Sequence, residues 1–468
     1  MANNMYLYLI FIALLLSDCY FINGLTGSLK KGSNSGVQRI KCNEDEEDIN
    51  TSIDQIRSVI NDTFKFYDNN LRNISKMIHN YRETAYEEYK SSKLLVDFLE
   101  QEGFTVEYGI ANRSTAFVAT YGNGDGGRTV SFNSEYDALP VIGHACGHNL
   151  IAIASLGAAL AVKEFLNETK LNGTVKLFGT PAEENGSGKL DLINGGYYKS
   201  VDMNIMAHPS RYSGAFIPYR AITKFEVEYF GKSAHAAISP WNGRNALDAL
   251  ILAFNSVSAL RQQLHSSYRL HGIIVNGGTA ANVIPDYTKG IFMIRTPTVN
   301  ELLNELKPRV IACFIAAANA TGCQVKITEK GLNKDVKINS ILGNLYELYF
   351  SKVQGVNSSN ILSKYEQREI SSGSTDQGHV SYVVPAIHAE YSIPTENQQG
   401  PHTKEFEKAA TTEQAFQETI KASKSLAFVA IDFLEDDLFA KNVIDEFKLS
   451  SSSSSSTTTT IPTTPSSS

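Results

Sequence analysis

The sequence predicts an α/β fold with a mainly parallel sheet, into which a second, smaller α+β domain is inserted. Short apolar runs alternate with helical patterns along most of the chain, and this alternation is typical of βαβ units. Near residue 216 the order changes to strand, helix, strand, strand, helix, strand, and the first pattern returns near residue 331. With 468 residues, of which 42% are hydrophobic, the chain is long enough to form two large cores.

The N-terminal residues are predicted to be a signal peptide (1–24) and a polar linker (25–50) that ends in an acidic run. Residues 5–16 form an apolar segment that is too short to span a bilayer but is typical of a secretory signal, with an uncleaved anchor or a chance apolar start as the alternatives. Several N-x-Ser/Thr sequons further indicate a secreted, extracellular glycoprotein. They include the sequons that begin at Asn50, Asn61, Asn73, Asn112, Asn167, Asn172, Asn319 and Asn357.

The first part of the main domain is predicted to span residues 51–215. It begins with a helical pattern over 52–101, which ends at Gly103. The segments that follow are strands at 116–121 and 129–132, an apolar helix at 150–166, and strands at 174–179 and 203–207. This alternation predicts a parallel sheet that is covered by helices on both faces.

The inserted domain is predicted to span residues 216–330 as a two-layer, ferredoxin-like sandwich that forms a lid. Its expected strands are 223–230, 269–275, 289–295 and 324–328, and its expected helices are 246–265 and 299–320. The main domain resumes over 331–435. Residues 436–468 are predicted to be a disordered tail, because a tract of serine and threonine cannot bury a core.

Charge and cysteine content exclude several classes of protein. The net charge of -7 and the absence of a basic stripe argue against nucleic acid as a partner and against a stable association with membranes. Of the five cysteines, Cys19 lies in the predicted signal peptide. The remaining Cys42, Cys146, Cys313 and Cys323 are too few for a disulfide scaffold of this size.

Side chains that can bind metal follow three of the predicted strands. His144, Cys146 and His148 follow the strand at 129–132, and His208 follows the strand at 203–207. A late loop adds His402. Thiolate and imidazole ligands suit zinc, and the carboxyl ends of parallel strands are where α/β folds bind ligands. The alternative interpretation is a buried cysteine among surface histidines.

Two adjacent carboxylates, Glu183 and Glu184, follow the strand at 174–179. In metal-dependent hydrolysis one such carboxylate can bind metal while its neighbour acts as the general base. A solvated acidic turn is the alternative for the pair taken alone. Three strand ends that each supply suitable donors favour a metal site.

The motifs of the chain together resemble a known family. They are EYDALP, HACGHN, TPAEENGSGK, MAHPS, GKSAHAAISPWNGRNALDA, TAANVIPD and GSTD, followed by a late histidine. This series resembles the aminoacylase / carboxypeptidase G family of di-zinc metallopeptidases over about residues 55–435. Within the family it is most similar to the amidohydrolase branch, which includes β-alanyl-lysine dipeptidase-like and p-aminobenzoyl-glutamate hydrolase-like enzymes.

The resemblance implies a di-metal catalytic domain with a lid that forms homodimers. It implies two zinc ions, with manganese or cobalt as alternatives. Glu135 stands two residues before Asp137, where other branches have a histidine, so His148 is expected to compensate. By matching motif, the residues are the metal ligands Cys146, His148, Glu184, His208 and His402, the general base Glu183, the orienting acid Asp137, and the substrate-binding lid residues His235, Asn282 and Arg295.

The implied activity is hydrolysis of an amide bond in a dipeptide or an N-acyl amino acid by a metal-activated water, with Glu183 as the base. The substrate is therefore expected to be a small molecule. Its carboxylate is a natural partner for Arg295, because a guanidinium binds a carboxylate through two parallel hydrogen bonds. The alternative, suggested by the Ser/Thr tail, is a secreted and catalytically inactive binding or wall-associated module on the same fold.

Overall fold

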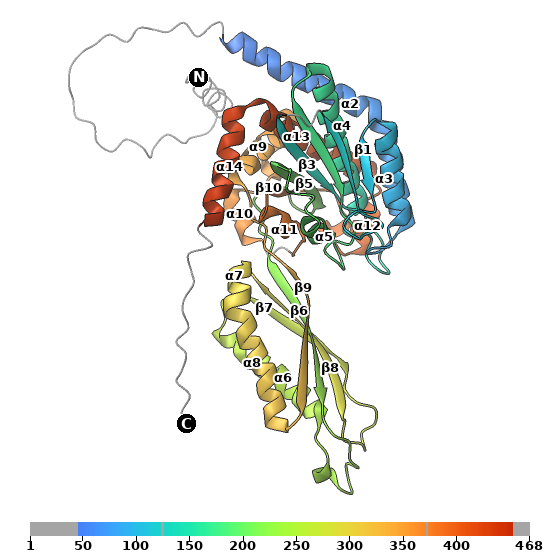
Figure 1. Cartoon of the computed structure of the whole chain (residues 1–468), viewed down its shortest axis with the longest axis vertical. Coiled ribbons are helices and arrows are strands. Elements are labelled where there is room, and N and C mark those ends of the chain that lie inside the picture. The colour runs from blue at the N-terminus through green and yellow to red at the C-terminus, as the bar shows by residue number, and fades with distance from the viewer. Residues whose placement is uncertain (1–44, 123–125, 371–372, 453–468) are drawn as a thin grey trace, which may run out of the picture.

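The computed structural model describes residues 45–122, 126–370 and 373–452, and it shows two α/β units (Figure 1). The larger unit contains a six-stranded sheet with the order β1-β2-β4-β3-β5-β10. Its strands are β1 (Thr105–Tyr108), β2 (Phe117–Gly122), β3 (Arg128–Ser134), β4 (Gly173–Gly179), β5 (Met203–Ser210) and β10 (Ala386–Ser392). Strands β4, β3, β5 and β10 are parallel, whereas β2 is antiparallel to β4 and β1 is antiparallel to β2.

Helices cover both faces of this sheet. The helices of the larger unit are α2 (Asp45–Tyr81), α3 (Tyr89–Gln101), α4 (His148–Thr169), α5 (Gly188–Asn194), α9 (Ser340–Leu348), α10 (Lys364–Glu369), α11 (Gln377–Ser381), α12 (Lys404–Ala409), α13 (Glu413–Glu435) and α14 (Asp437–Ser452). Helix α4 packs between α2 and α13 over one face. On the other face, Phe178 of β4 and Leu192 of α5 contribute to a second core with Val380 of α11.

Helix α4 is apolar over most of its length, and its position explains why. Within the described ranges it is the one helix long and apolar enough to cross a membrane, yet 89% of its most apolar window is buried in the protein. It contacts α2, α13 and the strands β3, β4 and β5. A helix that is apolar on all sides is expected at the centre of such a core.

The smaller unit is the predicted two-layer lid. Its elements are β6 (Ala221–Phe230), α6 (Ala246–Leu260), β7 (Arg269–Asn276), β8 (Tyr287–Thr296), α7 (Val299–Glu301), α8 (Lys307–Thr321) and β9 (Gln324–Asn333). The strands form an antiparallel sheet with the order β7-β8-β6-β9, and α6 and α8 lie over one face (Figure 1). Buried and half-buried residues alternate along β6 and β8, as expected when one face of a sheet is packed. The predicted fold class is confirmed.

Two predictions at the ends of the fold are wrong. The predicted linker 25–50 overlaps α2, which begins at Asp45, because an acidic run is favourable at a helix N-terminus. The predicted tail 436–468 overlaps α14, whose Phe439 and Val443 are buried against the main core. Glu446 also accepts hydrogen bonds from the first backbone N–H groups of α9. The predicted signal peptide and residues 453–468 lie outside the described residues.

The predicted helical stretch 52–101 is also broken, at residues 82–88 between α2 and α3. Arg82 and Tyr86 adopt positive φ angles of 51° and 63°, which end the helical path. Glu83 then accepts hydrogen bonds from the backbone N–H groups of Lys90 and Ser91 at the start of α3. The break places 82–88 beside the loops that follow β3 and β4, where Ala138 N–H donates to the Glu83 carbonyl at 2.7 Å.

Candidate metal centre and catalytic site

The predicted metal ligands meet at the carboxyl ends of β3, β4 and β5. Their donor atoms form three groups, and within each group all atoms lie within 4.8 Å of one another. The groups are Cys146, His148 and His208; Cys146, Glu184 and His402; and His148, Glu183 and Glu184. Because Cys146, His148 and Glu184 each belong to two groups, the arrangement resembles adjoining sites that share donors.

The distances between donors are short. Cys146 Sγ lies 3.4 Å from His208 Nε2, and Glu184 Oε1 lies 3.3 Å from His402 Nε2 and 3.9 Å from His148 Nε2. Cys146 and His148 are buried, whereas the His402 side chain is half exposed. The buried side of the site is therefore formed by the sheet, and its open side by the loop of His402.

A glycine between two of the ligands has a specific role. Gly147 adopts φ 79°, a left-handed conformation that turns the chain between Cys146 and the first residue of α4, His148. A Cβ atom at this position would lie 2.6 Å from Pro209 Cγ, next to the ligand His208. Only glycine lets the two ligand-bearing segments approach this closely.

Asp137 orients two of the ligands. Its Oδ1 lies 3.0 Å from His148 Nδ1, and its Oδ2 accepts a hydrogen bond of 3.0 Å from the backbone N–H of Glu184. The contact to Nδ1 leaves His148 Nε2 directed toward the other donors, as in carboxylate–histidine–metal arrangements. The structure thus places Asp137 where the sequence predicts an orienting acid, without contact to the cavity.

The donor set fits a divalent metal ion. Although buried, His148 Nε2 and Glu184 Oε1 form no hydrogen bond among the described residues and have only ion-pair contacts of 3.3–3.9 Å. Buried polar atoms without partners are costly, and a bound cation would satisfy both. Thiolate, imidazole and carboxylate together form a ligand set typical of zinc. Glu135 Oε2 lies 3.4 Å from His148 Nε2. Glu135 is the residue that stands where other branches of the family have a histidine.

Glu183 is the carboxylate best placed to move a proton. It lies in the loop after β4, within 4.8 Å of donor atoms of His148 and Glu184, and it lines the cavity. Burial raises the pKa of Glu183 well above its usual value, and the negative charges of Glu135 and Glu184 raise it further. A carboxylate in such surroundings holds a proton more readily than one in water.

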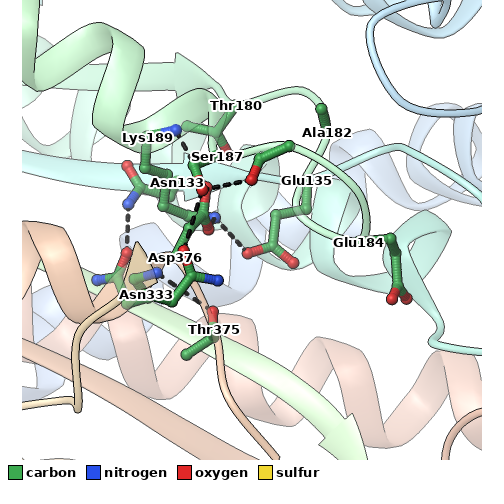
Figure 2. A network of polar contacts seen from close by, with 12 residues as sticks. Asn133, Glu135, Thr180, Ala182, Glu184, Ser187, Lys189, Asn333, Thr375 and Asp376 are labelled. Carbon is green, nitrogen blue, oxygen red and sulfur yellow. Dashed lines mark hydrogen bonds and ion pairs between the residues drawn. The ribbon is translucent and has the colours of Figure 1, made fainter. Parts of the chain in front are cut away.

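A buried ion network lies behind the metal centre (Figure 2). The Lys189 ammonium lies 2.6 Å from Glu135 Oε1 and also contacts Asp376, and all three side chains are completely buried. On the lid side, Ser187 donates to Asn333 Oδ1 at the end of β9, at 3.0 Å. The network therefore connects Glu135, the ligand loop and the lid strand.

Glu88 supports the loop that carries Glu183 and Glu184, a role that the sequence does not predict. Its Oε1 accepts a hydrogen bond of 3.0 Å from the backbone N–H of Ala182, whose φ is 61°, and its Oε2 accepts one of 2.8 Å from Thr115. Burial, with a smaller contribution from Asp137, raises the pKa of Glu88 to about 7. Glu88 sits in an acidic dipeptide within a helical pattern, which gives no signal of this contact.

Four other candidate residues from the sequence lie in different places. Arg295 lines the cavity between the two units and donates to Ser374 Oγ at 3.0 Å. His235 and Asn282 lie on neighbouring loops of the lid, where Ala236 N–H donates to the Asn282 carbonyl, and neither lines the cavity. His144, a possible ligand by its spacing, is buried beside His79 and belongs to none of the donor groups.

The cavity has a volume of about 840 Å³ and lies between the ligand loops and the lid strands. Its acidic lining residues are Glu183, Glu184 and Glu390, and its basic ones are Arg211, Lys224, Arg295 and Lys330. The site thus combines a metal-binding wall with a strongly cationic wall. This arrangement suits a small substrate that carries a carboxylate.

The fold and the site together define a metal-dependent hydrolase with an inserted lid. The sequence matches the peptidase family M20/M25/M40 over residues 131–430, and the chain belongs to this family. It is 38% identical over 386 residues to the Xaa-Arg dipeptidase of Mus musculus, covering 80% of this chain and 88% of the mouse protein. It is also 34% identical over 249 residues to one chain of the p-aminobenzoyl-glutamate hydrolase of Escherichia coli, covering 49% of this chain and 51% of the bacterial one.

Solved structures share the fold. An aminobenzoyl-glutamate utilization protein from Klebsiella pneumoniae aligns with a TM-score of 0.60 at 19% identity, covering 80% of this chain and 99% of that one. A dinuclear metal-binding peptidase of the M20 family from Bacillus subtilis aligns with a TM-score of 0.59 at 19% identity, covering 79% and 99%. The predicted resemblance and the predicted hydrolase class are confirmed, and nothing in these comparisons supports an inactive binding module.

Proposed function

We propose that this protein hydrolyses the amide bond of a dipeptide or an N-acyl amino acid at the metal centre, with Glu183 as the general base. The observation that carries the proposal is the placement of Glu183 within one cluster of donors, on the wall of a cavity lined by cationic side chains. The Xaa-Arg dipeptidase of Mus musculus, which is similar over 88% of its length, supports the dipeptide as the substrate class.

The side chains divide the work of the reaction. Two divalent ions would be held by Cys146, His148, Glu184, His208 and His402. When bound, such ions would lower the pKa of a bound water and polarise the scissile carbonyl. Glu183 takes a proton from the attacking water and later gives it to the leaving amine. Glu183 is suited to this cycle because its buried carboxyl group, with its raised pKa, can hold the proton between the two transfers.

Zinc is the metal that we propose, with manganese and cobalt as the alternatives to be tested. The Cys146 thiolate and two neighbouring imidazoles favour a borderline-soft ion over a hard one. Metal analysis after gentle purification should find about two equivalents of zinc per chain. Activity restored to the stripped protein by manganese but not by zinc would contradict this assignment.

The first test compares two neighbouring carboxylates. Glu183→Gln should lower turnover by about 10²–10⁴-fold at unchanged metal content, because it removes the proton acceptor and leaves the ligands in place. Glu184→Gln is the matched control, with the same substitution one residue further on, and it should lose bound metal as well as activity. If Glu183→Gln retains near wild-type turnover, the role of Glu183 as the base is wrong.

Arg295 is proposed to bind the carboxylate of the substrate. It is a cationic residue of the cavity wall and projects from β8 of the lid, where Ser374 holds its guanidinium. Arg295→Lys should weaken transition-state binding for a free acid because the two-pronged contact is lost. The loss should largely vanish for the amidated form of the same substrate, and an equal loss on both would assign Arg295 to the structure of the lid.

We further propose a homodimer formed through the lid. Strand β7 is an edge of the lid sheet, and its Ile273 and Val275 are 61% and 51% exposed. An exposed apolar edge strand has unpaired backbone N–H and C=O groups that can pair with another strand. A second copy of the lid would supply such a strand. His235 and Asn282 lie outside the cavity of their own chain, so they act on substrate only if a partner's cavity receives them.

His235 is prepared for such a role, because its Nδ1 accepts hydrogen bonds of 3.2 Å from the backbone N–H groups of Ala237 and Ile238. Nε2 therefore carries the proton and can donate it to an oxyanion. His235→Ala should lower turnover by about 10²–10³-fold at unchanged metal content. Mixed with Glu183→Gln, it should recover about a quarter of the wild-type activity through dimers with one complete site. No recovery after verified subunit exchange would refute a shared site.

The proposed location is extracellular. Asn50 belongs to the part of α2 whose side chains lie outside the description, and the other seven sequon asparagines named above are all exposed. Exposure is required for an attached glycan. Protein collected from the medium should begin near Leu25 and should shift in mass after N-glycan removal. An intact Met1 on secreted protein would contradict the signal peptide.

A further inference from the structure

A buried carboxylate in the cavity takes no part in the metal centre. Glu390 lies on β10, directly opposite His208 of β5 in the parallel register. Its side chain is 6% exposed, yet it lines the cavity. It belongs to none of the three donor groups, and it is the one acidic lining residue besides Glu183 and Glu184 within the described part of the chain.

Glu390 is held firmly in place. Its backbone forms two hydrogen bonds with Gly214, of 2.8 and 3.0 Å, and its Oε1 accepts a hydrogen bond of 2.7 Å from the hydroxyl of Tyr219. The Tyr219 ring in turn packs edge-on against His388 with 4.4 Å between ring centroids. Such support fixes the carboxylate in one orientation, as a specific binding group requires.

The carboxylate lacks a countercharge. Among the described residues, no lysine, arginine or histidine nitrogen lies within 4.0 Å of Glu390, although four cationic residues line the same cavity. Burial raises the pKa of Glu390, and hydrogen bonds from Ser210 and Tyr219 oppose this rise. Buried charges in proteins are normally paired, so this carboxylate is suited to pair with a cationic group that enters the cavity.

We propose that Glu390 binds a cationic group of the substrate, an ammonium or a guanidinium, and makes the enzyme selective for amides that carry one. The proposal rests on the proposed hydrolase function and names the substrate class within it. Because adjacent strands lie about 4.8 Å apart, Glu390 is within reach of a substrate bound at His208. The cation has two possible sources, the N-terminal amino group of a dipeptide and the basic side chain of the residue released.

Four substrates separate the two sources. Alanyl-lysine carries both cations, and alanyl-norleucine carries only the N-terminal ammonium. Nα-acetyl-lysine carries only the side-chain ammonium, and Nα-acetyl-norleucine carries neither. Glu390→Gln keeps the size of the side chain and an acceptor for Tyr219 but removes the charge. It should lower kcat/KM by about 10- to 150-fold for the substrates whose cation binds at Glu390. For the others it should change kcat/KM by less than about threefold.

The pattern of losses identifies the source. Losses on both lysine substrates assign Glu390 to the basic side chain, and losses on both alanyl substrates assign it to the amino group. A loss of similar size on all four, including acetyl-norleucine, or no loss on any, overturns the proposal. Tyr219→Phe is the matched control: it removes the hydrogen bond but keeps the charge, so it should preserve the preference for the cationic substrates. If Tyr219→Phe loses that preference as fully as Glu390→Gln, the charge is not the cause.

A binding measurement separates this proposal from the proposed function. Calorimetry with metal-loaded Glu183→Gln protein, and with the same protein carrying Glu390→Gln, measures the affinity for the four amides without turnover. A charge-dependent loss of affinity supports Glu390 as the cation site even if wild-type protein hydrolyses none of the four, in which case the hydrolase assignment fails alone. Affinity that is independent of Glu390 overturns the cation site, whatever the turnover.

Discussion

Replacement of Lys189 by methionine tests whether the buried ion network supports the fold of the main domain. The Lys189 ammonium lies between Glu135 and Asp376, and all three side chains are fully buried. At an effective dielectric constant of about 20, two unit charges 2.6 Å apart attract each other by about 6 kcal/mol. Much of this attraction offsets the cost of removing the charges from water, so the net contribution is smaller.

Methionine keeps the length of the lysine stem but leaves two buried carboxylates facing each other. Removing one partner of a buried ion pair costs about 3–5 kcal/mol, because the remaining charge is uncompensated. We expect this loss in the free energy of unfolding of the main domain. Urea titration followed by circular dichroism should show a lower midpoint with an unchanged slope.

Lys93→Met is the matched control, because Lys93 forms an exposed ion pair with Asp97 one turn along helix α3. Solvent screens such a pair, and the control should show no measurable shift. In an Asp376→Asn background, Lys189→Met should cost at least about 1 kcal/mol less, because one of the two charges that need lysine is already gone. A small loss on Lys189→Met alone, or strict additivity in the double variant, would refute the reasoning.

Three further predictions concern the metal, α14 and the response to acid. Removing the metal with a chelator should lower the unfolding temperature, because His148 Nε2 and Glu184 Oε1 lose their partner; an unchanged calorimetric transition would count against metal at this site. Phe439→Ala should destabilise the main domain by about 3 kcal/mol, with Leu438→Ala as the exposed control, and equal urea midpoints would mean that α14 does not pack as described. Burial lowers the pKa of His379 to about 4. Below pH ~6.5, the unfolded chain therefore binds a proton at this histidine that the folded protein does not bind. Stability should therefore fall between about pH 6.5 and 4, and His379→Gln should flatten this fall in urea midpoints unless another group causes it.

The grouping of the candidate metal ligands could be predicted from sequence because these residues follow periodic elements. Strands β3, β4 and β5 read as short apolar runs, and the donors come at their carboxyl ends or just beyond. Parallel strands bring these ends to one edge of the sheet, so separate motifs converge without any knowledge of tertiary contacts. Cys146 and His148 are two residues apart, and one glycine with a positive φ suffices to direct both into the same site.

The buried polar contacts of Lys189 and Glu88 around the candidate site could not be predicted, because they join segments that no local pattern connects. Lys189 follows a glycine- and serine-rich stretch that reads as an exposed loop, yet its partners are 54 and 187 residues away along the chain. Glu88 lies in a helical pattern that the structure interrupts without glycine or proline, at Arg82 and Tyr86. Hydrophobic periodicity reports which side of an element is buried, but it does not report which polar group a buried charge will meet.

The same distinction explains why the reaction class is easier to infer than the substrate. The proposed ligands and the proposed base lie at strand ends of the family fold, so the motifs that contain them indicate the chemistry. Glu390 lies inside β10, which reads as an ordinary buried strand, and its carboxylate is oriented by Tyr219, which lies two residues before the first strand of the lid. The proposed selectivity therefore depends on a contact between Glu390 and a residue of the segment that leads into the lid, and only the folded structure brings these two residues together.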